Sequence, residues 1–269
     1  MGQIVYAGRI ERRFMSAIYL VRHGQAGQNA LDNASDGGFE EAYDRLSDLG
    51  RHQAETVGRA LARRVPAHTP VIHGPLVRQR DTAAAVAAAL DSVTPTVDDA
   101  WKEIRFGDIL TPWFRENPGH TEALKRAKAG KLPRAQVDEV NRALTDAIDE
   151  WTTGPEFGDF RQTVRTGLFA AADLALDAGS VVVVSSGGPI AACVAETLPG
   201  ASWSDLISTV LNASVTVLGV KPGVDGAPRL SLRSLNEHAH LDGLNAEGRH
   251  PLRTFGCRSR PKGLVSFQN

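Results

Sequence analysis

The chain of 269 residues is poor in cysteine and has almost no net charge. Its two cysteines, Cys193 and Cys257, do not suggest a disulfide framework, so we expect a reducing compartment, the cytoplasm. Thirty basic and 31 acidic residues give a formal net charge of -1, which offers no electrostatic reason to expect nucleic acid or an anionic membrane as partner. No apolar run approaches the roughly 20 residues that span a bilayer, and the first 16 residues do not resemble a signal peptide.

Short apolar, β-rich runs alternate with helical stretches along most of the chain. Hydrophobic residues make up 42% of the sequence, which suits one large domain. The expected strands are residues 17–21, 69–73, 94–98 and 180–185, then an antiparallel pair at 213–220 and 229–235. The expected helices are residues 50–64, with Ser47 as a cap, 76–90, 161–178 and 189–198. This alternation predicts an α/β fold, a three-layer α/β/α sandwich with a mostly parallel sheet.

Residues 101–162 differ from the rest of the chain. They are rich in proline and glycine and contain two amphipathic pieces, at about 120–129 and 134–151. We interpret about 108–160 as a helical cap inserted into the sandwich. The expected organisation is an N-terminal extension (1–14), the domain that carries the cap (15–245) and a polar, poorly ordered tail (246–269), with a polar loop over the ligand crevice at 25–45.

The most informative motif is Arg22-His23-Gly24, which ends the first apolar run. Side chains at the carboxyl end of a buried strand open into the crevice where α/β sheets bind ligands. An imidazole there can attack phosphorus, and the adjacent guanidinium can hold phosphate oxygens through two parallel hydrogen bonds. The motif therefore indicates chemistry on a phosphate ester, and the alternative is an exposed loop histidine.

Further segments point to the same chemistry. They are Gly74-Pro75-Leu76-Val77-Arg78, Trp101-Lys102-Glu103-Ile104-Arg105, Ser185-Ser186-Gly187-Gly188 and the spaced motif Leu46-Ser47-x-x-Gly50-x-x-Gln53-Ala54. With Arg22-His23-Gly24 they make residues 17–240 resemble the histidine phosphatase superfamily, the phosphoglycerate mutase-like proteins. The resemblance implies a phosphoglycerate mutase-like sandwich and an enzyme that acts on phosphate esters.

The resemblance also implies roles for individual residues. His23 matches the nucleophile that becomes phosphohistidine, and Arg22 and Arg78 match two arginines that grip the phosphate. Asn29 matches an asparagine that often touches the phosphate. Glu103 matches the acid that protonates the leaving oxygen.

Elementary chemistry agrees with these roles. A phosphomonoester carries close to two negative charges near neutral pH, and two arginines neutralise most of that charge. The nucleophile must be neutral, and an ordinary histidine pKa of about 6.5 leaves a neutral fraction at pH 7. A protonated Glu103 would help the poor alkoxide leaving group to depart. The arginines supply the charge, so we expect neither a metal nor another cofactor.

One position departs from the family pattern. The family has Ser-His-Gly-Gly after the Val-rich strand, and its second histidine donates a hydrogen bond to the phosphate, whereas this chain has Ser186 there. The Ser186 hydroxyl and the backbone N–H groups of Gly187 and Gly188 can still donate to a phosphate, although a positive charge is lost. His73, at the end of the second predicted strand, is a candidate to compensate.

Some site residues have competing interpretations. Arg78 can instead be a helix-surface arginine paired with Asp81. Asp99 and Asp108 lie near enough in the sequence to replace Glu103 as the acid. The pair His238 and His240 has the look of a metal site, but the resemblance implies a structural role there.

The leading hypothesis is a metal-independent phosphatase, similar to the histidine acid phosphatases, that hydrolyses a small phosphorylated substrate through phosphohistidine. One alternative is a phosphotransferase of the phosphoglycerate mutase type. Another is a weakened enzyme that binds a phosphorylated ligand or protein, because Ser186 replaces a histidine. Substrate specificity is expected to come from residues 30–45 and 108–160, and a homodimer is left open.

Overall fold

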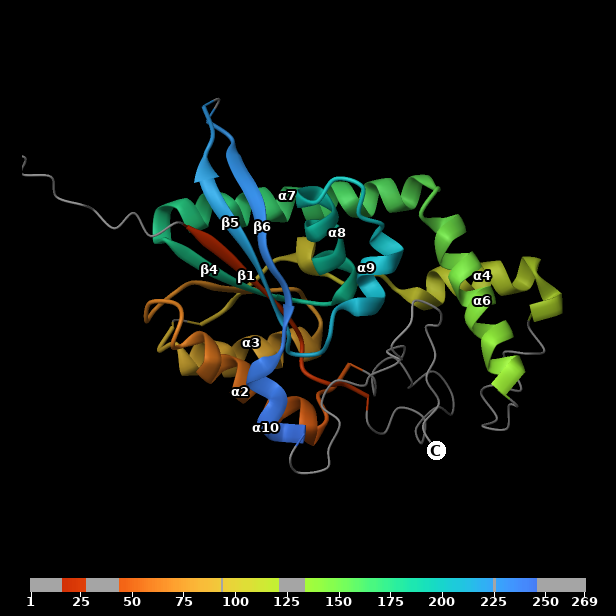
Figure 1. Ribbon diagram of the computed structural model, residues 1–269, viewed down its shortest axis with the longest axis horizontal. Helices are drawn as coiled ribbons and strands as arrows, with labels where there is room; N and C mark the ends of the chain where they lie inside the picture. The colour runs from red at the N-terminus through yellow and green to blue at the C-terminus, as the bar shows by residue number, and fades with distance from the viewer. Residues whose placement is uncertain (1–15, 28–43, 93, 121–133, 225, 246–269) are drawn as a thin grey trace, which may run out of the picture.

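A computed structural model describes residues 16–27, 44–92, 94–120, 134–224 and 226–245 (Figure 1). The predicted helix at 120–129, most of the predicted loop at 25–45, the extension and the tail lie outside these ranges. Within the described ranges, every helix is too short or too polar to cross a membrane.

A six-stranded sheet forms the centre of the molecule, in the order β3-β2-β4-β1-β5-β6. Its strands are β1 (Ala17–Arg22), β2 (Val71–His73), β3 (Thr96–Val97), β4 (Ser180–Ser185), β5 (Val215–Pro222) and β6 (Pro228–Glu237). The four strands from β3 to β1 are parallel, while β5 and β6 are added antiparallel. The prediction of a mostly parallel sheet is confirmed. The valine run of β4 is buried on both faces, as expected for an inner parallel strand.

Helices cover both faces of this sheet, which confirms the three-layer sandwich. One face carries α2 (Asp48–Leu61), α3 (Val77–Ala89) and the short α10 (Asp242–Asn245), and the other carries α7 (Pro155–Ala178), α8 (Gly187–Thr197) and α9 (Trp203–Thr209) (Figure 1). Alternation along β1 separates two cores: Ile18 and Leu20 pack with the α7 side, Ala17 and Val21 with the α2 side. Short 3₁₀ turns, η1 (Asp99–Trp101) and η2 (Ala239–Leu241), complete the described elements.

Helices α4 (Phe106–Glu116) and α6 (Arg134–Trp151) lie at one end of the molecule (Figure 1). The bounds of α6 match the predicted piece at 134–151. The predicted start of the next helix at 161 is wrong, because α7 begins at Pro155. Gly154 caps that helix and Pro155 occupies its first turn, where proline loses no hydrogen bond. One helix thus runs from the α4–α6 end into the sandwich.

The motif around Ser47 explains how α2 is joined to the chain after β1. Ser47 caps α2 as predicted, since its Oγ accepts from the Gly50 N–H at 3.0 Å. Gln53 is fully buried and accepts the backbone N–H of Gln25 at 2.7 Å. A Cβ on Gly50 would lie 2.0 Å from the Gln25 carbonyl oxygen, and a Cβ on Gly24 2.2 Å from the Gly50 carbonyl oxygen. The loop that follows β1 therefore rests directly on helix α2.

We expect Gly50→Ala to destabilise the protein by about 1–3 kcal/mol, because the added methyl overlaps the backbone of Gln25. Gly158→Ala is the matched control: Gly158 is an exposed helical position with nothing within 4 Å of the added Cβ. That substitution should leave stability unchanged or raise it by about 0.5–1 kcal/mol. Thermal unfolding of both variants tests this, and equal stabilities would contradict the described packing.

Candidate active site

The candidate site lies where β1 and β4 end. These strands are parallel neighbours, with Arg22 in register with Ser185, so the residues after each strand meet at one edge of the sheet. The His23 N–H donates to the Ser185 carbonyl at 2.9 Å, which places Ser186 beside the Arg22-His23 pair. The two motifs that the sequence analysis singled out after apolar runs therefore lie next to each other.

The ring of His23 is buried and is held in one tautomer by its neighbours. Its Nδ1 lies 2.7 Å from the Gly24 carbonyl oxygen, which can only accept, so Nδ1 carries the proton. Nε of Arg78 lies 3.1 Å from Nε2 of His23, and a guanidinium can only donate. The lone pair of Nε2 therefore faces the cation, and the ring is neutral.

Electrostatics favour the same neutral ring. Burial lowers the pKa of His23 well below 6.5, and the nearby charges of Arg78 and Arg22 lower it further. The hydrogen bond to the Gly24 carbonyl acts in the opposite direction and offsets only part of this lowering of the pKa. An imidazole that resists protonation keeps a nucleophilic nitrogen near neutral pH.

Arg78 is fixed by an acid that sequence analysis missed. Asp44 Oδ1 lies 2.8 Å from Nη1 of the buried Arg78, and the same carboxylate accepts the backbone N–H groups of Val77 and Arg78. Asp44 therefore caps α3 while it orients the guanidinium at its start. The alternative pairing of Arg78 with Asp81 is wrong, because Asp81 pairs with Arg80.

Arg22 and the backbone of His23 are held by the chain between α9 and β5. The Arg22 guanidinium donates to the Val210 carbonyl. The Asn212 side-chain amide donates to the His23 carbonyl at 3.0 Å, and the Ala213 N–H lies within hydrogen-bond distance of the Arg22 and His23 carbonyls. Asn212 was missed because nothing in its sequence neighbourhood marks it.

The late histidines support that same chain segment. Asn236 accepts the Leu211 N–H at 2.8 Å and donates to the Thr209 carbonyl at 2.8 Å. His240 Nε2 lies 2.9 Å from the Ala213 carbonyl, and His238 Nδ1 lies 2.8 Å from the Asn236 carbonyl. Across the described residues, no cluster of three or more histidine, cysteine or acidic side chains could hold a metal ion. These contacts are structural.

Glu103 reaches the same edge of the sheet from the chain after η1. Its Oε2 accepts the Gly188 N–H at 3.1 Å and its Oε1 accepts the Ile104 N–H at 3.0 Å. Burial raises the pKa of this carboxyl above 4.5, although both hydrogen bonds and the charges of Arg78 and Arg22 act in the opposite direction. The alternatives are less suited: Asp99 is exposed, and Asp108 is exposed and pairs with Arg105.

The backbone that holds Glu103 is itself held by Trp203. The indole Nε1 of Trp203 donates to the Gly188 carbonyl at 2.9 Å, and the N–H of the same residue donates to Glu103, so Gly188 connects the two side chains. The ring of Trp203 packs against Trp151 and Phe157, with centroids 5.6 and 5.3 Å away. This aromatic cluster joins the end of α6, the start of α7 and α9.

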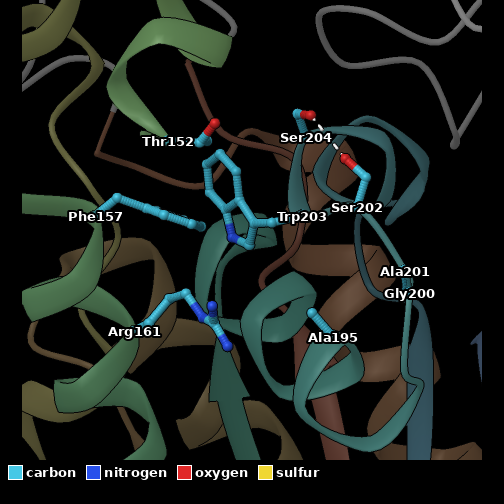
Figure 2. A pocket seen from close by; sticks show the side chains of 9 residues that line it. All are labelled: Thr152, Phe157, Arg161, Ala195, Gly200, Ala201, Ser202, Trp203 and Ser204. Atoms are coloured by element: carbon cyan, nitrogen blue, oxygen red, sulfur yellow. Dashed lines mark hydrogen bonds between the residues drawn. The ribbon is translucent and has the colours of Figure 1, made fainter. Parts of the chain in front are cut away.

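Trp203 also lines a cavity of about 350 Å³ (Figure 2). Figure 2 shows Trp203, Phe157 and Arg161 facing into it from α9 and α7. Its lining comprises Thr152, Phe157, Arg161, Ala195, Gly200, Ala201, Ser202, Trp203 and Ser204. None of the predicted site residues lines this cavity.

The remaining predicted residues fall into three groups. Ser186 is buried at the start of α8 beside Gly187, and a Cβ on Gly187 would lie 3.9 Å from the Arg22 guanidinium carbon. His73 is buried with Nδ1 2.6 Å from the Gly74 carbonyl, and among the described residues no hydrogen bond joins its ring to Ser186, Arg22 or Glu103. Asn29 lies outside the described residues.

Comparison with known proteins identifies the class. The model of the histidine phosphatase superfamily (branch 1) matches residues 18–230, which is most of the chain. The chain therefore belongs to this superfamily, as its motifs predicted. No curated protein matches the sequence significantly.

Solved structures agree on the fold. Phosphoglycerate mutase from Bacillus anthracis str. Sterne is 19% identical, with 86% of this chain and 98% of that chain covered and a TM-score of 0.53. A putative alpha-ribazole-5'-P phosphatase from Escherichia coli str. K-12 is also 19% identical, with 82% and 96% covered and a TM-score of 0.53. A mycobacterial glucosyl-3-phosphoglycerate phosphatase is 26% identical, with 83% and 100% covered and a TM-score of 0.47. The first two confirm the predicted phosphoglycerate mutase-like fold.

Proposed function

We propose that the protein is a phosphatase that hydrolyses a small phosphomonoester through a phosphohistidine on His23. The main support is the position of His23: a buried, neutral imidazole whose Nε2 faces the guanidinium of Arg78, with the charge of Arg22 close enough to affect its pKa. A dianionic phosphoryl group brought to the two arginines would meet that nitrogen. Solved structures that resemble this chain in fold carry the names of a putative phosphatase and a phosphoglycerate mutase.

The first half of the reaction transfers the phosphoryl group. Nε2 of His23 uses its lone pair to form a bond to phosphorus while the bond from phosphorus to the ester oxygen breaks. Nε–H of Arg78 turns from Nε2 to a phosphoryl oxygen, and Arg22 binds another, so both cations stabilise the transferred group. Glu103, whose protonated form is favoured by burial, gives its proton to the departing alkoxide.

The second half releases phosphate. The Glu103 carboxylate takes a proton from water as the water oxygen attacks phosphorus, and the bond from phosphorus to Nε2 breaks. Nδ1–H of His23 stays on the Gly24 carbonyl throughout, which stabilises the positive charge that the ring carries as phosphohistidine. Neither half requires a metal, since the two guanidinium groups supply the positive charge.

His23→Ala should lower phosphatase turnover by at least about a thousandfold, because the covalent step loses its nucleophile. The assay uses p-nitrophenyl phosphate and a panel of phosphometabolites, with ³²P transfer to the protein as a direct measure of phosphohistidine. His52→Ala, at an exposed position of α2, is the control and should keep full activity.

Two outcomes would contradict the proposal. Equal, near-zero turnover of the native protein and His23→Ala with persistent binding of phosphate esters would favour a binding protein. Formation of an isomeric ester from 3-phosphoglycerate without free phosphate, followed by ³¹P NMR, would favour a mutase.

Glu103→Gln should lower kcat by about 10²–10⁴ for an alkyl phosphate but by about tenfold or less for p-nitrophenyl phosphate, whose leaving group needs no proton. The activity of the native protein on an alkyl ester should fall at low pH, where His23, with a pKa well below 6.5, becomes protonated. It should also fall at high pH, where Glu103, with a pKa above 4.5, ionises. The variant should lose the high-pH decline. Equal losses on both substrates would show that Glu103 is not the acid.

Trp203→Phe keeps an aromatic side chain but removes the hydrogen bond to the Gly188 carbonyl, and with it one support of Glu103. We expect kcat on an alkyl ester to fall about fivefold with KM unchanged, as for the loss of about one hydrogen bond, and p-nitrophenyl phosphate to be affected less. Trp113→Phe is the matched control, because its indole, in α4, donates to Glu150 of α6 at 2.8 Å and not to Gly188. Equal effects of both variants, or of Trp203→Phe on both substrates, would exclude a positioning role.

A further inference from the structure

Ser186 occupies the cap position of α8 but does not cap it. Its backbone is extended, its residue surface is 1% exposed, and its Oγ makes no hydrogen bond to the free N–H groups of the helix. Nε2 of Gln79 lies 2.9 Å from that Oγ instead. The hydroxyl that stands where the family has its second histidine is therefore paired with a side chain from α3.

The amide of Gln79 can have only one orientation. This residue is fully buried, its Nε2 also lies 3.0 Å from the Trp101 carbonyl, and its Oε1 accepts the Leu76 N–H at 3.1 Å. Exchange of the two amide atoms would place an oxygen against the Trp101 carbonyl and an N–H against the Leu76 N–H. Gln79 therefore donates to Ser186, and the Ser186 oxygen accepts.

This pairing controls where the hydroxyl proton of Ser186 can point. A proton directed at Gln79 would meet an N–H group, so it must lie elsewhere. Among the residues that the structure describes, none accepts a hydrogen bond from Ser186 Oγ. Strand β4 lies between β2 and β1. Gln79 approaches from the β2 side, where a Cβ on Gly74 would lie 2.3 Å from its Oε1, whereas His23 follows β1 on the other side.

We propose that Gln79 is a positioning residue that turns the Ser186 hydroxyl toward the phosphoryl group, and that this pair replaces the donor lost with the second histidine. The inference rests on the proposed function for its ligand, a phosphate group at His23. Gln79 itself does not touch the phosphate. It occupies one of the two lone pairs of the Ser186 oxygen, so the hydroxyl proton points away from Gln79 and the serine acts as a donor. His73, the compensating residue that the sequence suggested, makes no hydrogen bond to Ser186 among the described residues.

A double-mutant cycle tests the pairing with inorganic phosphate as the probe and its Kd, by ³¹P NMR titration, as the readout. Ser186→Ala should weaken phosphate binding about tenfold, because a hydrogen bond to a charged group is lost. Gln79→Met, of similar volume but without donors, should weaken it about fivefold. Combined with Ser186→Ala, Gln79→Met should add less than a further twofold, because its effect passes through the hydroxyl.

A merely structural role for Gln79 would give a different pattern. If Gln79→Met weakens binding by the same factor with and without Ser186, or has no effect in the native background, the proposal is overturned. Absence of phosphate binding in the native protein also overturns it. A second measurement avoids variants of Gln79: its side-chain amide ¹⁵N resonance should shift on phosphate addition in the native protein and not in Ser186→Ala, and an equal shift in both contradicts the proposal.

These outcomes are separate from those for the hydrolase. A native protein that binds phosphate with the expected coupling but does not turn over esters would refute the phosphatase and leave the role of Gln79 intact. A native protein that hydrolyses esters, but in which the two substitutions weaken phosphate binding by independent factors, would refute the role of Gln79 and leave the phosphatase intact.

Discussion

The site depends on keeping one buried imidazole neutral next to cations. A protonated His23 would place a third positive charge beside Arg78 and Arg22 in a region that water does not screen, which is why its pKa is lowered. The neutral form is also the only one that satisfies its partners, because Gly24 accepts from Nδ1 and Arg78 donates to Nε2. The hydrogen bonds around His23 therefore orient the ring, while its burial determines its charge state.

The pKa of the other ionisable group of the site, Glu103, is shifted by the same cause in the opposite direction. Burial disfavours the charged form of either kind of group, so it lowers the pKa of His23 and raises that of Glu103. When both groups are neutral, the charged groups among the described site residues are the guanidinium groups of Arg22 and Arg78 and the carboxylate of Asp44. Two positive charges and one negative charge leave a single positive charge, which attracts a dianion. The burial that favours a neutral nucleophile at His23 also favours the protonated acid at Glu103.

The sequence predicted features that depend on one segment or on the ends of strands. The Arg22-His23 and Ser186 segments each follow an apolar run that was predicted as a strand, and the cap at Ser47 is a local signal. Contacts between distant segments were not predictable in this way. Asp44 had no sequence feature linking it to Arg78, 34 residues away, while Asp81 was a nearer and wrong candidate. The link from Trp203 to Glu103 passes through a backbone carbonyl, which no residue pattern records.

Whether Ser186 can stand in for a histidine depends on the direction in which its neighbours orient the hydroxyl. A serine is both donor and acceptor, and a buried one pointing the wrong way would offer a phosphate its lone pairs, which repel an oxyanion. The fixed amide N–H of Gln79 occupies one of those lone pairs and turns the hydroxyl proton away from itself without adding a charge. The charge lost with the histidine stays lost, so phosphate binding depends more heavily on the two arginines. Their supports, Asp44 and the Val210 carbonyl, are accordingly part of the site.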